Sequence, residues 1–289
     1  MKYGIVYAYW SKDWEGDYIS TIKRAAKCGF DVLEIFTPGL LEVSGEKLKE
    51  LRKAAQEYNI EFTFLVGLSK QYNIASPEGT IRREGISYVK KLLDVVHKLG
   101  GKCFSGINYC AWSDFEGYDR KQEYIQNSIC SLKEIGRIAQ DYDISYNLEI
   151  TNRFENFLLN TAREARAFVD EVDNPNVNIL LDVFHMNIEE DSFYDAIVTA
   201  GEKLGHFHVG QNNRRNPHPG DMVAWKLVAD GLKKIGYDKR ITLEPLVKTG
   251  GTVSRDSNIW RDMTNGAEEV MMDQNVMEGL KFIRSLMEK

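Results

Sequence analysis

Short runs of apolar and β-branched residues recur along the chain, and an amphipathic stretch follows each of them. Such runs are typical of buried strands, and the stretches between them are long enough for helices. Eight runs have this character: GIVYAY near residue 5, DVLEIF near 33, EFTFLV near 63, KCFSGI near 104, SYNLEI near 147, VNILLD near 179, GHFHV near 207 and RITLE near 242. The pattern therefore predicts eight strand-helix units.

Residues that begin or end helices stand between these runs. Pro77 suits the first position of a helix, and Gly100 suits its end. The TARE segment at 161–164 matches a capping box. Gly236 predicts the end of a further helix, and apolar residues at helical spacing predict a closing helix over 273–289.

The number and order of these units predict a single α/β domain over residues 1–289. Parallel strands need crossover helices, and eight such units in 289 residues match the length of about 250 residues that is typical of a (β/α)8 TIM barrel. The alternative is an open, doubly wound sheet. It is disfavoured because no GxGxxG turn follows the first strand and because of where the polar residues fall.

Four consecutive predicted strands carry an ionisable residue at or near their C-terminal ends: Glu149, Asp182, His208 and Glu244. In a (β/α)8 barrel these ends converge on the face that carries the chemistry. Three clustered carboxylates repel one another unless a cation neutralises them. Carboxylate oxygens with one imidazole suit Mn²⁺, Mg²⁺ or Co²⁺ better than a structural zinc. A carboxylate that ends one strand can also be a helix cap, and for Asp182 alone both interpretations stay open.

His206 and His208 form an HxH pair on one predicted strand. Alternation sends both side chains to the same face of the sheet. Only the residue nearer the strand end reaches the mouth of the barrel, so His208 is the predicted ligand and His206 is predicted to lie in a layer below it.

Composition narrows the classes of function. The net charge is −6, and Lys and Arg are scattered among Asp and Glu, so neither nucleic acid nor a membrane is an expected partner. The same charge and only five histidines disfavour an endonuclease for abasic DNA on a similar barrel. No uninterrupted apolar run reaches about 18 residues, so a cytoplasmic protein is expected. No CxxC pair occurs, so we expect reduced core thiols at Cys28, Cys103, Cys110 and Cys130.

At the strand ends and over nearly the whole chain, the sequence resembles the ketose 3-epimerases, the family of D-tagatose and D-allulose (D-psicose) 3-epimerases. The segments that carry the resemblance are MKYGIVYAYW, NRFENFLLNTA, LLDVFHMNIEEDS, GHFH, LEPLVKTGGT and IWRD. The resemblance implies a xylose-isomerase-like TIM barrel that forms a homodimer or homotetramer. It also implies Mn²⁺ or Co²⁺ held by Glu149, Asp182, His208 and Glu244.

The resemblance further implies a reaction and its residues. Glu149 and Glu244 would be the acid/base pair, and the substrate contacts carry over onto Glu155, His185, Arg214 and Trp112. Without the resemblance, Glu155 and Arg214 would be interpreted as surface loop residues.

The implied reaction is metal-dependent inversion of carbon 3 in a free ketose of the D-allulose/D-fructose or D-tagatose type. Removing a proton beside the carbonyl builds negative charge, which a divalent ion can stabilise, and the second glutamate returns a proton to the opposite face. The alternative is a related metal-dependent isomerase or lyase for another keto-sugar, a keto-glycoside or a sugar phosphate. A catalytically silent sugar-binding protein is disfavoured by the intact ligand set.

Three residues depart from the family pattern near the expected sugar site. They are Val6, Ile107 and Gln211. We expect them to change the wall of the pocket, so the sequence leaves the choice of ketose open.

Overall fold

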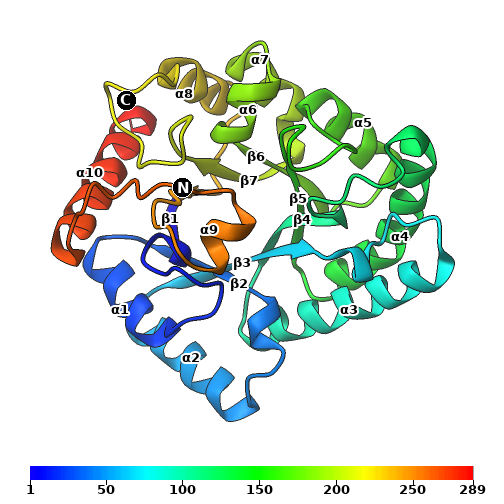
Figure 1. The fold of residues 1–289 in the computed structure, drawn as a ribbon, viewed down its shortest axis with the longest axis horizontal. Helices are drawn as coiled ribbons and strands as arrows, with labels where there is room; N and C mark the ends of the chain where they lie inside the picture. Colours follow the sequence, from blue (N-terminus) through cyan, green and yellow to red (C-terminus); the bar gives the residue numbers. More distant parts are fainter. Residues whose placement is uncertain (289) are drawn as a thin grey trace.

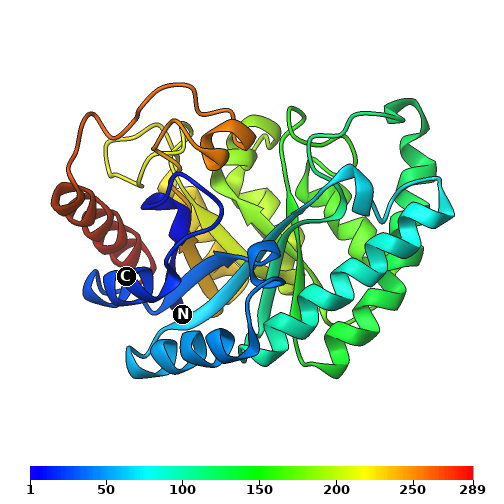
Figure 2. The ribbon, with the colours of Figure 1, turned by 60° about the horizontal axis from the view of Figure 1, so that its bottom comes forward.

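Eight parallel strands form a closed barrel in the computed structural model, which describes residues 1–288. Each strand pairs with the next one along the chain, and the last pairs with the first. Helices surround the barrel (Figure 1), and the loops that follow the strands gather at the end opposite the N-terminus, at the top of Figure 2. The predicted (β/α)8 class is confirmed, and Lys289, the last residue of the predicted closing helix, lies outside the described residues.

The strands lie where the apolar runs predict them. They are β1 (Lys2–Val6), β2 (Val32–Phe36), β3 (Glu61–Leu68), β4 (Cys103–Ala111), β5 (Ser145–Ile150), β6 (Val177–Asp182), β7 (Leu204–Val209) and β8 (Arg240–Leu243). The α-helices are α1 (Tyr18–Lys27), α2 (Gly45–Glu57), α3 (Gly79–Lys98), α4 (Lys121–Asp141), α5 (Ala162–Val172), α6 (Val183–Glu189), α7 (Phe193–Ala200), α8 (Trp225–Lys234), α9 (Thr252–Asp256) and α10 (Glu269–Met287). Short 3-10 helices are η1 (Tyr7–Tyr9), η2 (Pro38–Leu40), η3 (Lys70–Tyr72), η4 (Tyr118–Arg120) and η5 (Gly201–Lys203). Within residues 1–288, none of the helices combines the length and the apolar character that a membrane span requires.

The predicted helix ends are mostly confirmed. The Thr161 hydroxyl accepts the Glu164 amide at 3.2 Å, and the Glu164 carboxylate accepts the Thr161 amide at 3.3 Å, which completes the capping box of α5. Gly100 and Gly236 follow the ends of α3 and α8 with φ of +77° and +63°. These are backbone conformations that favour glycine.

Pro77 does not occupy the first helical position, so that prediction is wrong by two residues. Helix α3 begins at Gly79. The Ser76 hydroxyl instead accepts the amide of Glu78 at 3.1 Å, which holds a turn around the proline before the helix starts.

The cysteines are free thiols among the described residues. Cys28, Cys103 and Cys110 are buried as predicted. Cys130 is exposed on the outer side of α4, so the prediction of a core thiol is wrong there.

Six strands each place one polar side chain inside the barrel, and we call this set the polar layer. Its members are Glu34, Thr63, Ser105, Asn147, His206 and Thr242, all with 0% exposure. They are linked by hydrogen bonds: the Ser105 hydroxyl lies 3.0 Å from His206 Nδ1, and the Thr242 hydroxyl lies 2.9 Å from His206 Nε2. His206 therefore lies below the mouth of the barrel, as expected.

Gly106 shapes β4 just before Ile107. It has φ of +116°, and a Cβ there would lie 2.1 Å from the carbonyl oxygen of Val66 on β3. The neighbouring strand therefore leaves no room for a side chain at this point of the barrel.

We predict that Gly106→Ala lowers the free energy of unfolding by more than about 3 kcal/mol, because the methyl group adds a backbone clash to an unfavourable φ. The matched control is Gly236→Ala, whose Cβ meets nothing within 4 Å and which should cost only about 1–2 kcal/mol. Urea denaturation measures both. Equal losses in the two variants would contradict the clash.

Candidate active site

Four neighbouring strands place the predicted ligands at the mouth of the barrel. Glu149 lies on β5, Asp182 ends β6, His208 lies on β7, and Glu244, the last residue of the predicted strand, directly follows β8, which ends one residue earlier. Their exposed fractions are 7%, 1%, 0% and 8%. Asp182 and His208 are paired across β6 and β7, which brings these strand ends to the same height.

Glu149 links the four predicted ligands into two overlapping groups. Donor atoms of Glu149, His208 and Glu244 lie within 4.8 Å of one another, and so do those of Glu149, Asp182 and His185. Neither ring nitrogen of His208 makes a hydrogen bond among the described residues, and Nδ1, which lies 3.5 Å from Glu244 Oε2, is the one that faces the carboxylates of the cluster. A buried imidazole nitrogen without a partner, facing carboxylate oxygens, fits a divalent cation that takes oxygen and nitrogen ligands.

Asp182 both caps a helix and faces the carboxylate cluster, the two roles that the sequence left open. Its Oδ1 accepts the Phe184 amide at 3.1 Å and caps α6. Its Oδ2 lies 3.0 Å from Arg214 Nη1 and belongs to the carboxylate cluster. One oxygen therefore fixes the side chain while the other faces the site.

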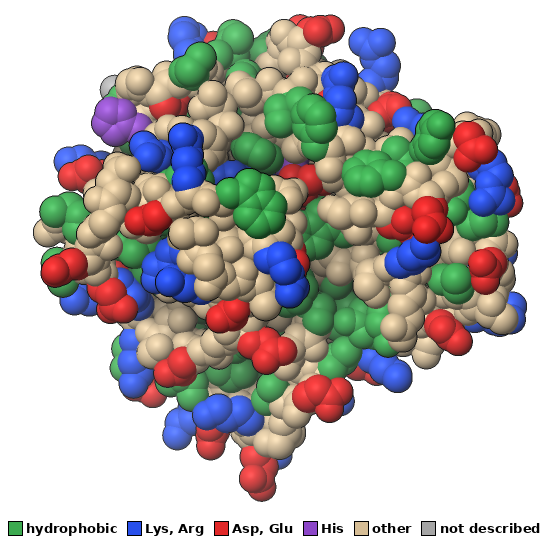
Figure 3. Space-filling view, viewed as in Figure 1, with side chains coloured by type: hydrophobic (Ala, Val, Ile, Leu, Met, Phe, Trp, Pro, Cys, Tyr) green, Lys and Arg blue, Asp and Glu red, His purple; other side chains and the backbone are tan. Residues whose placement is uncertain are grey.

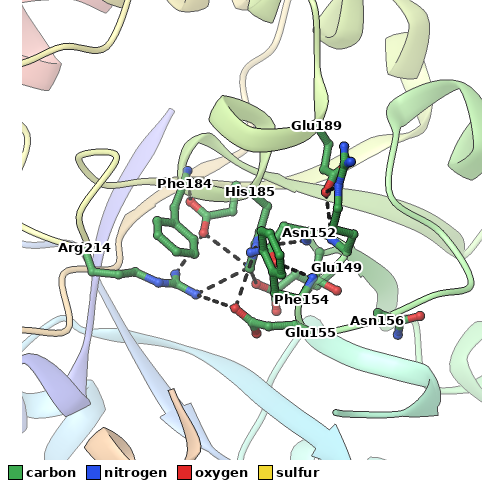
Figure 4. A network of polar contacts seen from close by, with 12 residues as sticks. Glu149, Asn152, Phe154, Glu155, Asn156, Phe184, His185, Glu189 and Arg214 are labelled. Atoms are coloured by element: carbon green, nitrogen blue, oxygen red, sulfur yellow. Dashed lines mark hydrogen bonds and ion pairs between the residues drawn. The ribbon is translucent and has the colours of Figure 1, made fainter. Parts of the chain in front are cut away.

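Arg214 lies outside any predicted strand, which had suggested a surface loop residue, but the structure buries it. It is 8% exposed, and its Nη1 lies 2.6 Å from Glu244 Oε2 as well as 3.0 Å from Asp182 Oδ2. Its guanidinium carbon lies 3.9 Å from the centre of the Phe184 ring (Figure 4). The loop after β7 thus brings a positive charge into the carboxylate cluster, with Arg214 itself held at φ of +64°.

The two glutamates have opposite pKa shifts. Burial raises the pKa of Glu149. Burial acts in the same direction on Glu244, but His208 and Arg214 outweigh it and lower the pKa of Glu244 to about 2. Pairs of carboxyl groups with divergent pKa values are typical of sites that transfer protons.

His185 presents one nitrogen to the cluster. Its Nδ1 accepts the backbone amide of Asn152 at 3.2 Å, so the proton of the neutral ring lies on Nε2. Nε2 lies 3.7 Å from Glu149 Oε1 and 3.8 Å from Asp182 Oδ2. His185 can therefore offer a hydrogen bond to a ligand between these carboxylates (Figure 4).

Glu155 also lies in the site, although it was expected on the surface without the resemblance. Its side chain is 13% exposed, and its Oε2 accepts the indole N–H of Trp112 at 3.0 Å. Its Oε1 lies 3.8 Å from Arg214 Nη2. All four predicted substrate contacts thus lie around one cavity.

This cavity has a volume of about 50 Å³, with a polar end and an apolar end. It is lined by Trp14, Phe36, Leu65, Val66, Gly67, Ile107, Trp112, Glu149, Glu155, His185, Arg214, Glu244, Leu246 and Ser257. Of the three departures from the family pattern, only Ile107 belongs to this lining. The expectation that Val6 and Gln211 belong to the pocket wall is wrong, because Gln211 turns away and donates to the Asn216 carbonyl at 2.6 Å.

Figure 3 views the mouth of the barrel. Lys and Arg side chains lie among Asp and Glu around this face, and hydrophobic side chains gather near its centre. The mouth of the barrel therefore carries mixed charges around an apolar centre and does not form a continuous basic groove.

Glu34 of the polar layer was not predicted from the sequence as a site residue. Its Oε1 lies 2.7 Å from His208 Nε2, directly below the cluster. The signal was a charged residue in the middle of the apolar run DVLEIF. A carboxylate at such a position is almost always paired when buried.

We predict that Arg214→Met lowers the free energy of unfolding in chelator-treated solution by about 3–5 kcal/mol, because it leaves buried carboxylates without their cation. Arg215→Met is the matched control, since Arg215 makes a half-exposed contact with Asn265 at 3.2 Å and should cost less than about 1 kcal/mol. Thermal and urea unfolding measure both variants. A loss for Arg214→Met no larger than the control would contradict the role of charge compensation.

Comparison with known proteins places this site in a family. Residues 22–284 match the family described as the xylose isomerase-like TIM barrel. The D-psicose 3-epimerase of Ruminiclostridium cellulolyticum is 40% identical over 290 residues, which cover 100% of this chain and 98% of that protein. The D-psicose 3-epimerase of Agrobacterium fabrum is 40% identical over 286 residues, 98% of each protein.

A solved structure shows the same relationship in three dimensions. The crystal structure of D-psicose 3-epimerase with D-tagatose from Clostridium cellulolyticum H10 has a TM-score of 0.97 and 40% identity, and covers 99% of both chains. The similarity thus extends over nearly the whole chain. The chain belongs to the ketose 3-epimerases of the xylose isomerase-like TIM barrel family and is an isomerase acting on carbohydrates.

Proposed function

We propose that this enzyme inverts carbon 3 of a free ketose of the D-allulose/D-fructose or D-tagatose type, with a divalent metal as cofactor. The observation that carries the proposal is the pair Glu149 and Glu244, which are buried at the ends of separate strands and line the same cavity. The similarity to D-psicose 3-epimerases along the whole chain supports the same reaction.

The proposed metal ligands are Glu149, Asp182, His208 and Glu244. Their donor atoms are three carboxylates and one imidazole, which favours Mn²⁺, with Co²⁺ or Mg²⁺ as alternatives. When bound, such an ion would act as a Lewis acid that stabilises negative charge on the sugar oxygens. The unpartnered Nδ1 of His208 supports this assignment.

In the proposed reaction the two glutamates act from different sides of the sugar. Glu149 extends from β5 and Glu244 follows β8, with β6 and β7 between them in the barrel. One carboxylate removes the proton from carbon 3, and the other returns a proton to the opposite face. Which glutamate acts first depends on the epimer that binds.

The remaining polar residues would hold the sugar in place. Arg214 carries N–H groups into the carboxylate cluster, where it can donate to oxygens that gain negative charge, and His185 Nε2 lies 3.7 Å from Glu149 at the same place. Glu155, oriented by the Trp112 indole, can accept a hydrogen bond from a hydroxyl group. The apolar end of the cavity, with Phe36 and Ile107, would exclude water from the reacting carbon.

The resemblance further supports a cytoplasmic homodimer or homotetramer as part of this proposal. Light scattering on the purified protein, whose chain has a mass of 33.1 kDa, distinguishes either assembly from a monomer.

We predict that Glu149→Gln and Glu244→Gln each lower kcat for epimerisation at carbon 3 by at least about 10³-fold, because each removes one proton-transfer group. Chromatography of D-allulose, D-fructose and D-tagatose incubated with Mn²⁺ and each variant measures the rates, and circular dichroism checks the fold.

The matched control is Glu190→Gln. Glu190 is half-buried and accepts the Ala162 amide at 2.6 Å, but it does not line the cavity. This variant should keep near-normal turnover. Near-normal turnover in Glu149→Gln or Glu244→Gln would reject the acid/base assignment.

A further inference from the structure

A fully buried carboxylate outside the proposed ligand set contacts the proposed metal histidine. Glu34 lies on β2, on the opposite side of the barrel from the strands that carry Glu149 and Asp182, and it has 0% exposure. A buried carboxylate is costly unless its oxygens are paired, so its partners indicate what it does.

Both oxygens of Glu34 have defined neighbours. Oε2 accepts the Thr63 hydroxyl at 2.7 Å and lies 3.4 Å from His206 Nδ1. Oε1 lies 2.7 Å from His208 Nε2. Thr63 and His206 therefore hold one oxygen in place, and the other is directed at the ring of His208.

His206, which contacts Glu34 Oε2, is itself held in place by two hydroxyl groups. His206 lies between the hydroxyls of Ser105, 3.0 Å from Nδ1, and Thr242, 2.9 Å from Nε2. These residues come from β4, β7 and β8, so the polar layer ties Glu34 on β2 to the far side of the barrel. The position of Glu34 is thus set by the barrel and not by a mobile loop.

The contact determines which nitrogen of His208 faces the carboxylate cluster. A neutral imidazole carries one proton, and the carboxylate 2.7 Å from Nε2 favours the tautomer protonated at Nε2, since neither Nε2 nor Glu34 Oε1 has another hydrogen-bond partner among the described residues. The lone pair then lies on Nδ1, which faces Glu244 Oε2 at 3.5 Å. This is the tautomer and the ring orientation that a metal ligand at Nδ1 requires.

We infer that Glu34 is a positioning residue for the metal site, which orients His208 and increases its strength as a ligand. The inference rests on the proposed function, because it assumes that His208 binds the metal. It extends the site from the four strands of the ligands to β2 and β3, through Glu34 and Thr63.

The test is Mn²⁺ binding to metal-stripped protein, measured by isothermal titration calorimetry or competition with a fluorescent chelator. Glu34→Gln keeps the size of the side chain and removes its charge. We expect it to weaken Mn²⁺ binding by about 10- to 100-fold. Thr63→Val, which leaves the carboxylate but removes the hydroxyl that orients it, should weaken binding less, and it serves as the test if Glu34→Gln does not fold.

Ser105→Ala is the matched control. Ser105 belongs to the same polar layer and contacts His206, but it does not contact Glu34 or His208 through any hydrogen bond. Because Ser105 reaches Glu34 only through His206, its loss should lower the melting temperature of the metal-free protein and change Mn²⁺ affinity less than Glu34→Gln or Thr63→Val does. The absorption spectrum of bound Co²⁺ gives a second readout, which should change more in Glu34→Gln than in Ser105→Ala.

Mn²⁺ affinity within twofold of the wild type in Glu34→Gln, or an equal loss in Glu34→Gln and Ser105→Ala, would overturn the inference. A wild-type protein that does not bind Mn²⁺ would overturn it as well. A wild-type protein that binds Mn²⁺ but epimerises no ketose would reject the proposed function, while weaker binding in Glu34→Gln would still support the role of Glu34.

Discussion

Burial of three carboxylates at one end of the barrel is the constraint on which the site depends. Glu149, Asp182 and Glu244 come from strand ends that the closed barrel brings together, and none is more than 8% exposed. Like charges in such an environment repel strongly because the effective dielectric constant is low. Arg214 compensates two of them, with its Nη1 2.6 Å from Glu244 and 3.0 Å from Asp182, which explains why a loop residue is buried here.

The barrel supports this cluster from below and the loops complete it from above. Below, the polar layer replaces the usual apolar filling of a barrel interior with side chains that bond one another. Above, Glu155 and Arg214 come from loops after β5 and β7, where rigid strands position variable connections. The fixed part of the site thus carries the proposed chemistry, and the loops carry the proposed sugar contacts.

The sequence predicts the barrel and the proposed ligands because both follow from local patterns. Apolar runs of strand length mark β1 to β8, and an ionisable residue at the end of a buried run stands out, as Asp182 and His208 do. Arg214 and Glu155 could not be placed from spacing, because loop residues reach the site only through the tertiary fold; the family resemblance alone indicated them. The contact between Glu34 and His208 across the barrel could not be predicted either, because the two residues are 174 positions apart along the chain.

The three residues that depart from the family pattern do not all lie in the pocket wall. Of Val6, Ile107 and Gln211, only Ile107 lines the cavity, and Gln211 instead donates to the Asn216 carbonyl. Departures from a family pattern change a pocket only where the side chain points into it.

The most direct test of the central claim is solvent exchange at carbon 3. Metal-stripped protein, with and without added Mn²⁺, is incubated in heavy water with a panel of free ketoses, and proton NMR follows deuterium incorporation. The account predicts Mn²⁺-dependent exchange at carbon 3 together with appearance of the carbon-3 epimer. Absence of exchange with every free ketose, in protein that binds Mn²⁺ tightly, would contradict it.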